Sequence, residues 1–208
     1  MKKSLIASGL ISLFMLGCTS ATQSVTPVLQ SSDSYSLHTS IDKFTPSIRT
    51  LTGEDIKLTS FFSFKDFIQG DVINVTPVYV FNKSCSSYYL VFKRIGDGWL
   101  FIDGITFLIN NQPITIRAKT APLHESLYSS TVLEQITFEI PEDILISLLK
   151  VDNVPIRLLG DKFAEEQLLN RDVLNNLTIF YNTTKRYDKC RIDSVGCNQD
   201  ALGIPFSN

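Results

Sequence analysis

The strongest constraint on the fold is the way short apolar runs alternate with turn residues between positions 72 and 159. In the run 72–81, Ile73, Val75, Tyr79 and Phe81 fall on one face with the two-residue period of a strand. Pro77 lies on the same face and cannot donate to a ladder, which predicts an edge strand or a bulge at this point. The same criteria predict strands at 72–81, 88–95, 99–102, 105–110, 113–117, 132–140 and 154–159.

Two Asp-Gly pairs sharpen this prediction. Asp97-Gly98 and Asp103-Gly104 bracket the apolar run 99–102. Asp-Gly between apolar runs is typical of a type I′ hairpin, whose two central residues need positive φ. We therefore expect residues 88–117 to form a tight meander of four strands, with a further corner at 110–113.

Helical patterns occur only late in the chain. Pro141, Glu142 and Asp143 precede the apolar run 144–151, and acids in a first turn suit the helix dipole. A second helix is indicated by a stripe at three- and four-residue spacings, formed by Leu169, Val173, Leu177, Phe180, Tyr181 and Thr184. Strands first and helices late predict an α+β fold. It should be mainly antiparallel β, meander- or sandwich-like, with one or two helices in the C-terminal third.

The N-terminus has the features of an export signal. Lys2 and Lys3 precede an apolar run over residues 5–17, which is too short to cross a bilayer as a permanent helix of about 20 residues. The segment Met15-Leu16-Gly17-Cys18 resembles the lipobox of bacterial lipoproteins, whose usual form is Leu, a small or aliphatic residue, Gly or Ala, then Cys. Met15 stands where the family usually has Leu.

The resemblance implies a specific maturation. Cleavage would follow Gly17, and Cys18 would carry lipid on its sulfur and its amine, so that the membrane is a partner of the mature chain. The family's inner-membrane retention signal is an Asp after the lipidated Cys, and this chain has Thr19 there. The resemblance therefore implies a lipid-anchored envelope protein, on the outer membrane facing the periplasm if the organism has two membranes.

The composition divides the chain into three parts. Residues 1–17 form the signal peptide, and 18–36 form a lipidated tether in which nine of the eighteen residues 19–36 are Ser or Thr. Such a stretch buries too little surface to offset its ordering entropy, so we expect a flexible linker. Residues 37–208 remain for a single globular domain, a length that suits one hydrophobic core.

Charge and motifs exclude several function classes. The formal net charge of the 208 residues is −2, which provides no field for nucleic acid. Neither a Gly-x-Ser-x-Gly elbow, nor a phosphate-binding loop, nor a His-Glu-x-x-His motif occurs. The two histidines, His38 and His124, are expected in exposed loops. We expect no metal and no cofactor.

Glu134 is the one carboxylate with an unusual position. In a strand, alternate residues face the same side, so Glu134 lies on the same face as Ile136 and Phe138 and would point into the core. A carboxylate buried there needs a partner. Arg157, on a nearby predicted strand, is the expected partner in a buried ion pair; the alternative is a bulge that turns Glu134 outward. Five aromatic residues cluster in this part of the sequence: Tyr88, Tyr89, Phe92, Trp99 and Phe101. We expect them to form either part of the core or a surface that contacts a ligand.

The cysteines follow from the compartment. With Cys18 lipidated, three remain in an oxidising environment, so one pair can form. Cys190 and Cys197 flank a turn-forming segment, and a bond between them would stabilise the fold by about 2.5 kcal/mol. Cys85 would then be the free thiol. Alternatives are a bond from Cys85 to either of the other two, or a zinc site, which lacks ligands.

Two functions remain. The first is a non-catalytic, lipid-anchored envelope lipoprotein that binds an envelope protein, glycan or lipid, or acts structurally. The second is a lipid-anchored hydrolase in which Glu134 works with Asp97 or Asp103 as paired carboxylates. We favour the first, because both aspartates already have a role as turn formers.

Overall fold

The computed structural model describes residues 22–27, 35–42, 44–45, 47–60, 71–82, 85–128, 130–161 and 163–192, with backbone alone at 22–27, 59–60 and 189–192. Within these residues the chain forms strands β1 to β13 and two helices, α2 (Glu142–Leu148) and α3 (Arg171–Ile192). The predicted α+β class, mainly antiparallel β with two helices in the C-terminal third, is confirmed.

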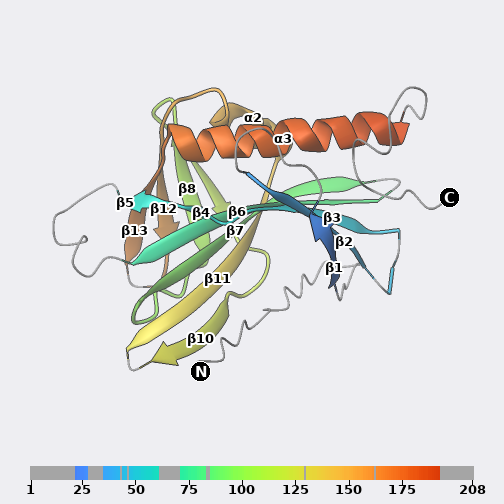
Figure 1. Ribbon diagram of the computed structural model, residues 1–208. Helices are drawn as coiled ribbons and strands as arrows, with labels where there is room; N and C mark the ends of the chain where they lie inside the picture. The colour runs from blue at the N-terminus through green and yellow to red at the C-terminus, as the bar shows by residue number, and fades with distance from the viewer. Residues whose placement is uncertain are drawn as a thin grey trace.

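The strands form two sheets in which every pair of neighbours is antiparallel (Figure 1). The larger sheet has the order β1 (Thr22–Pro27), β2 (Leu37–Asp42), β3 (Arg49–Gly53), β6 (Val72–Phe81), β7 (Ser86–Asp97), β11 (Thr131–Ile140), β10 (Leu123–Tyr128), and β4 (Ile56–Lys57) also pairs with β6. The smaller sheet has the order β5 (Thr59–Ser60), β13 (Ala164–Leu169), β12 (Val154–Leu159), β8 (Gly104–Ile109), β9 (Gln112–Arg117).

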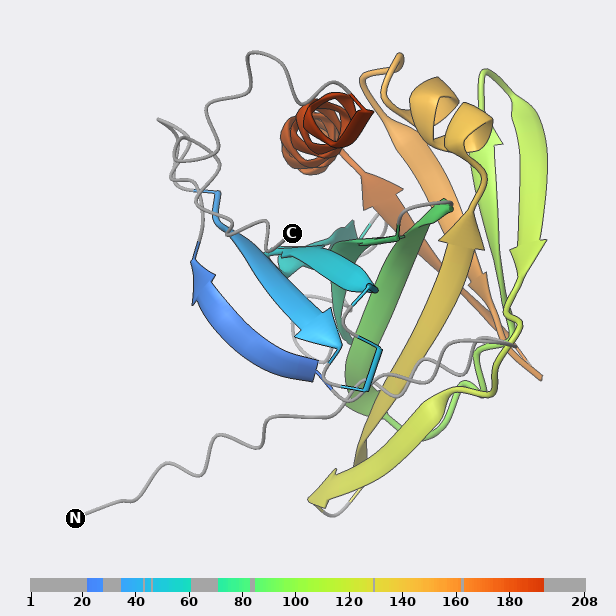
Figure 2. The same ribbon diagram turned by 90° about the vertical axis from the view of Figure 1, so that its right-hand side faces the viewer.

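One hydrophobic core joins the two sheets and α3. Figure 2 looks along α3 and shows it lying across both sheets, with the strands of the larger sheet below it and those of the smaller sheet at its right. Four members of the predicted stripe, Val173, Leu177, Phe180 and Thr184, are almost fully buried on this helix, whereas Leu169 belongs to β13 and Tyr181 is half-buried. The helix begins at Arg171 because the side chain of Asn170 accepts a hydrogen bond from the amide of Val173 at 3.0 Å, an N-cap.

The predicted four-stranded meander over 88–117 is wrong in its first half. After β7 the chain does not turn back beside it but passes through residues 98–103 into β8 of the other sheet. The run 99–102 forms no strand. The second half is confirmed: β8 and β9 form a two-residue hairpin in which Asn110 and Asn111 both have positive φ (50° and 63°), as a type I′ turn requires.

Pro77 lies on an interior strand, so the predicted edge strand is wrong. On one side β6 pairs with β7, opposite Leu90. On the other side the ladder passes from β3, whose pairing ends at Val78, to β4, which begins at Val75. Pro77 therefore lies where no neighbour requires its missing amide hydrogen.

Seven strands lie where none was predicted, namely β1 to β5, β10 and β13. Residues 22–27, within the expected flexible tether, form β1 and pair with β2. β10 and β13 are missed because half of each sequence, LHESLY and AEEQLL, is polar and the polar residues do not alternate with the apolar ones. Both contribute to the site described below. No helix within the described ranges is long and apolar enough to span a membrane.

The aromatic residues are divided among three places. Tyr88 and Phe92 belong to the main core, whereas Tyr89 lies in a small second cluster with Val78 and Val91. Trp99 is half-buried, and Phe101 is exposed. Cys85 is an exposed free thiol at the β6–β7 turn, and the predicted Cys190–Cys197 bond lies outside the described side chains.

Candidate functional site

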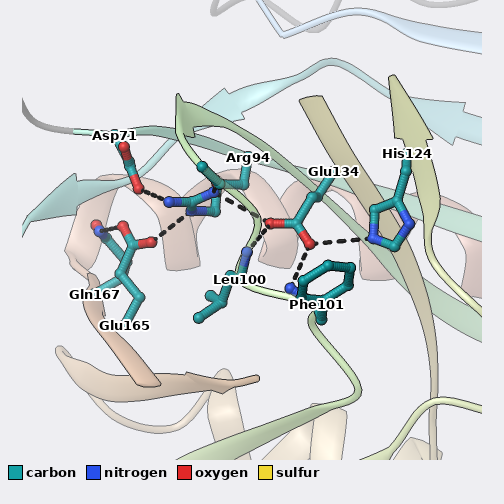
Figure 3. A network of polar contacts seen from close by, with 9 residues as sticks. Asp71, Arg94, Leu100, Phe101, His124, Glu134, Glu165 and Gln167 are labelled. Carbon is teal, nitrogen blue, oxygen red and sulfur yellow. Dashed lines mark hydrogen bonds and ion pairs between the residues drawn. The ribbon is translucent and has the colours of Figure 1, made fainter. Parts of the chain in front are cut away.

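A buried arginine organises the contact between the two sheets. Arg94 is on β7, shares strand parity with Phe92 and is 2% exposed. Its Nε donates to Glu165 Oε2 on β13 at 2.8 Å, and its Nη2 pairs with Asp71, which precedes β6. Its Nη1 donates to Glu134 Oε2 at 3.1 Å and to the carbonyl of Gly98 at 2.9 Å (Figure 3). Every guanidinium nitrogen is thus bonded.

Glu134 is the second centre of this network and is fully buried, as its strand parity predicts. It lies directly opposite Arg94 in the pairing of β11 with β7. Its Oε2 also accepts the amide of Leu100 at 2.7 Å, and its Oε1 accepts the amide of Phe101 at 2.6 Å. The Nε2 of His124, on β10, lies 3.2 Å from the same Oε1. One carboxylate therefore fixes the segment between the two sheets and contacts the edge strand.

The partner of Glu134 is Arg94, so the predicted pairing with Arg157 is wrong. Arg157 lies on β12 and alternates with the buried Ile156 and Leu158, which turns its side chain outward. There it pairs with Glu166 across the β12–β13 ladder, with Nε donating to Oε1 at 2.9 Å. Arg94 shares the inward parity of β7, the same signal that marks Glu134.

The network has more negative than positive groups. Three carboxylates, on Asp71, Glu134 and Glu165, contact one guanidinium. Burial opposes the charge of Arg94, but its hydrogen bond to Glu165 and the three negative charges outweigh burial and raise its pKa. Burial raises the pKa of Glu165, and the charge of Asp71 raises it further, against the opposing effect of Arg94.

The segment fixed by Glu134 presents the aromatic ring of Phe101 to solvent, with the half-buried Trp99 nearby. Phe101 has a φ of 56°, which is rare for a bulky residue, and its side chain is 42% exposed. Its ring lies edge-on to His124 at 5.4 Å, and Trp99 contacts His124 at 4.9 Å. We call Trp99, Phe101 and His124 the aromatic cluster. A strained backbone that displays a ring is typical of a binding site.

The other predicted candidates lie apart from this network. Asp97 is exposed and accepts from Ser130 Oγ at 3.1 Å, and Asp103 pairs with Arg117 at 2.6 Å. Neither shares a bond with Glu134 within the described part of the chain. Both histidines lie on strands rather than in loops, with His38 on β2. Among the described residues, no group of three or more His, Cys, Asp or Glu is arranged to hold a metal ion.

Comparison with known proteins does not assign this site. No protein-family model matches the chain, and neither a curated protein nor a solved structure matches it. The function must therefore be argued from the residues themselves.

Removing the buried guanidinium is expected to be costly. Arg94→Met leaves three carboxylates without their shared cation, and breaking such a buried pair costs about 3–5 kcal/mol. Arg157→Met, the matched control, breaks only an exposed pair and should cost at most about 1 kcal/mol. Urea unfolding of both variants measures the difference. Equal losses would contradict the assignment of Arg94 as the central cation.

The raised pKa of Glu165 predicts a pH dependence. Because the folded state holds this proton more tightly than the unfolded chain, the Glu165 contribution to stability falls as pH rises from the ordinary carboxyl pKa of 4.5 through the raised value. Glu165→Gln should therefore flatten the decline in unfolding free energy above pH 4.5. Glu166→Gln, on the next residue of the same strand, is the control. A slope unchanged by Glu165→Gln would refute the prediction.

The strain at Phe101 predicts an unusual order of stabilities. Glycine adopts positive φ freely, whereas a residue with a Cβ pays about 1–2 kcal/mol there. Phe101→Gly and Phe101→Ala remove the same ring contacts, so the glycine variant should be the more stable by about 1 kcal/mol. Thermal unfolding compares the two. An alanine variant as stable as the glycine variant would show that the backbone is not strained.

Proposed function

We propose that the protein is a lipid-anchored lipoprotein of the bacterial cell envelope that binds a partner through its aromatic cluster without chemical conversion. The anchoring part rests on the sequence: an export signal that ends in Met15-Leu16-Gly17-Cys18. In a two-membrane organism, Thr19 favours the outer membrane and a periplasmic domain. The membrane is then one partner, and an envelope protein or glycan is the other.

The binding part rests on one observation, which is that a fully buried carboxylate fixes the backbone that displays Phe101. Glu134 uses both oxygens to hold Leu100 and Phe101, and this pre-ordering spares a partner the entropy of ordering the segment. Exposed aromatic side chains on a rigid segment are typical anchors of protein interfaces. The edge strand β10, which carries His124, also exposes Leu123 and Tyr128.

The contacts of Glu134 favour binding over hydrolysis. Its two oxygens contact Arg94, two backbone amides and His124, so no oxygen is left to exchange a proton with a substrate. General acid–base work needs a carboxyl group within reach of the reacting atoms. Asp97 and Asp103 are bonded elsewhere.

Mass spectrometry of the mature N-terminus tests the anchor. We expect cleavage before Cys18 and an acylated cysteine, and Cys18→Ser should leave the chain uncleaved or release it from the membrane. An unmodified Cys18 in protein extracted from membranes would contradict the anchoring part.

Co-purification of the detergent-extracted chain with its envelope neighbours tests the binding part. Phe101→Gly should lose partners that the unaltered chain retains, because it removes the displayed ring without adding backbone strain. Phe163→Gly, at a 53% exposed phenylalanine between β12 and β13, is the control and should retain them. Partners lost equally from both variants, or from neither, would contradict a role for the aromatic cluster.

A further inference from the structure

Another exposed phenylalanine, Phe44, lies at the edge of the larger sheet where the described part of the chain begins. Thr22, the first residue of β1, pairs with Asp42, the last residue of β2. Cys18 precedes Thr22 by four residues, a span of at most about 14 Å. Only two residues after Asp42 comes Phe44, whose side chain is 76% exposed.

The connection between β2 and β3 is built to hold Phe44 in this position. Asp42 is 3% exposed, and its Oδ1 accepts the amide of Phe44 at 2.9 Å, as in an Asx turn. The amide of Asp42 donates to the carbonyl of Ile48 at 3.2 Å. The amide of Ile48 donates to the carbonyl of Thr45 at 2.8 Å. These backbone hydrogen bonds hold the β2–β3 connection in a compact turn, and the ring of Phe44 remains exposed to solvent.

We infer that Phe44 inserts into the interface of the bilayer that carries the lipid on Cys18, as a second contact that orients the domain. This inference rests on the proposed anchoring. A single exposed apolar side chain on a protein surface needs no explanation. Here, however, the chain between Cys18 and Thr22 is too short to hold the β1–β2 edge far above the headgroups. An exposed aromatic ring at that edge would enter the region where aromatic side chains favourably lie.

The topology then places the aromatic cluster at the far end of the larger sheet. Arg49 of β3 pairs with Phe81 at the end of β6, close to the anchored edge. Val72, at the start of β6, pairs with Ile95 near the end of β7 and close to Trp99. Nine strand steps of about 3.3 Å separate the two ends of β6, or about 30 Å. Figure 1 shows the same separation, with the end of β10 at lower left and β1 and β2 at right. A domain seated on Phe44 would thus direct the aromatic cluster away from the membrane.

Tryptophan fluorescence of the full-length lipidated protein in vesicles tests the inference. In a Trp99→Phe background, Phe44→Trp supplies the only indole, and Phe163→Trp supplies a matched exposed probe between β12 and β13 of the smaller sheet. The vesicles contain phosphatidylethanolamine and phosphatidylglycerol, with or without brominated acyl chains that quench tryptophan. We expect the Phe44→Trp probe to shift its emission to shorter wavelengths and to lose most of it in brominated vesicles. The Phe163→Trp probe, and Trp99 of the unaltered chain, should keep theirs.

Mass spectrometry of the same samples separates the two ways of failing. A lipidated, vesicle-bound chain whose Phe44→Trp probe is as bright with bromine as without would overturn the insertion and leave the anchor standing. Equal quenching of the Phe44→Trp and Phe163→Trp probes would also overturn it, because the domain would then have no fixed orientation. A chain without lipid on Cys18 would overturn both the anchor and the insertion.

Discussion

The ion pair between Arg94 and Glu134 is the interaction on which the arrangement of the two sheets depends. Arg94 connects β7 of the larger sheet to Glu165 of the smaller one, and Glu134 holds the amides of the segment that crosses between them. Burying charges is expensive, and their attraction compensates only where the remaining hydrogen bonds are also made. Here all three guanidinium nitrogens and both oxygens of Glu134 are bonded, so the network fixes one specific arrangement of the sheets.

This arrangement connects the core to the surface. Because Glu134 determines the backbone of Leu100 and Phe101, the position of an exposed ring depends on a group that solvent does not reach. A variant of Arg94 would therefore disturb the aromatic cluster without touching it. A comparable arrangement occurs at the opposite end of the larger sheet, where the buried Asp42 carboxylate accepts the backbone amide of the exposed Phe44. In the proposed function the ring of Phe101 contacts a partner, and in the further inference the ring of Phe44 contacts the membrane.

Strand parity predicts much of the fold but not which strands meet. The alternation over 132–140 correctly places Glu134 in the core, and the same rule applied to 88–95 would have placed Arg94 beside Phe92. It would also have excluded Arg157, which alternates with buried Ile156 and Leu158. The pairing partner could not be derived, because it depends on β7 lying beside β11, a contact between residues about forty positions apart.

The aromatic site itself was partly visible in the sequence. The turn signal at Asp97-Gly98 is real, since Gly98 has a φ of 73°, but it marks a crossing between sheets instead of a hairpin. Local turn chemistry is the same in both cases, so sequence alone does not separate them. β10, which brings His124 to the cluster, was missed because its side chains are almost all exposed. An edge strand whose two faces are both exposed to solvent has no alternating apolar and polar pattern to detect.

Amide hydrogen exchange at Leu100 and Phe101 tests the central claim most directly. Both residues lie outside regular secondary structure, and Phe101 is at the surface, so their amides would exchange rapidly if they were free. If the carboxylate of Glu134 holds them, both should be protected as strongly as the neighbouring strand amides of β7, and Arg94→Met should reduce that protection. Rapid exchange at both positions in the unaltered protein would contradict the claim that the buried network orders the surface segment.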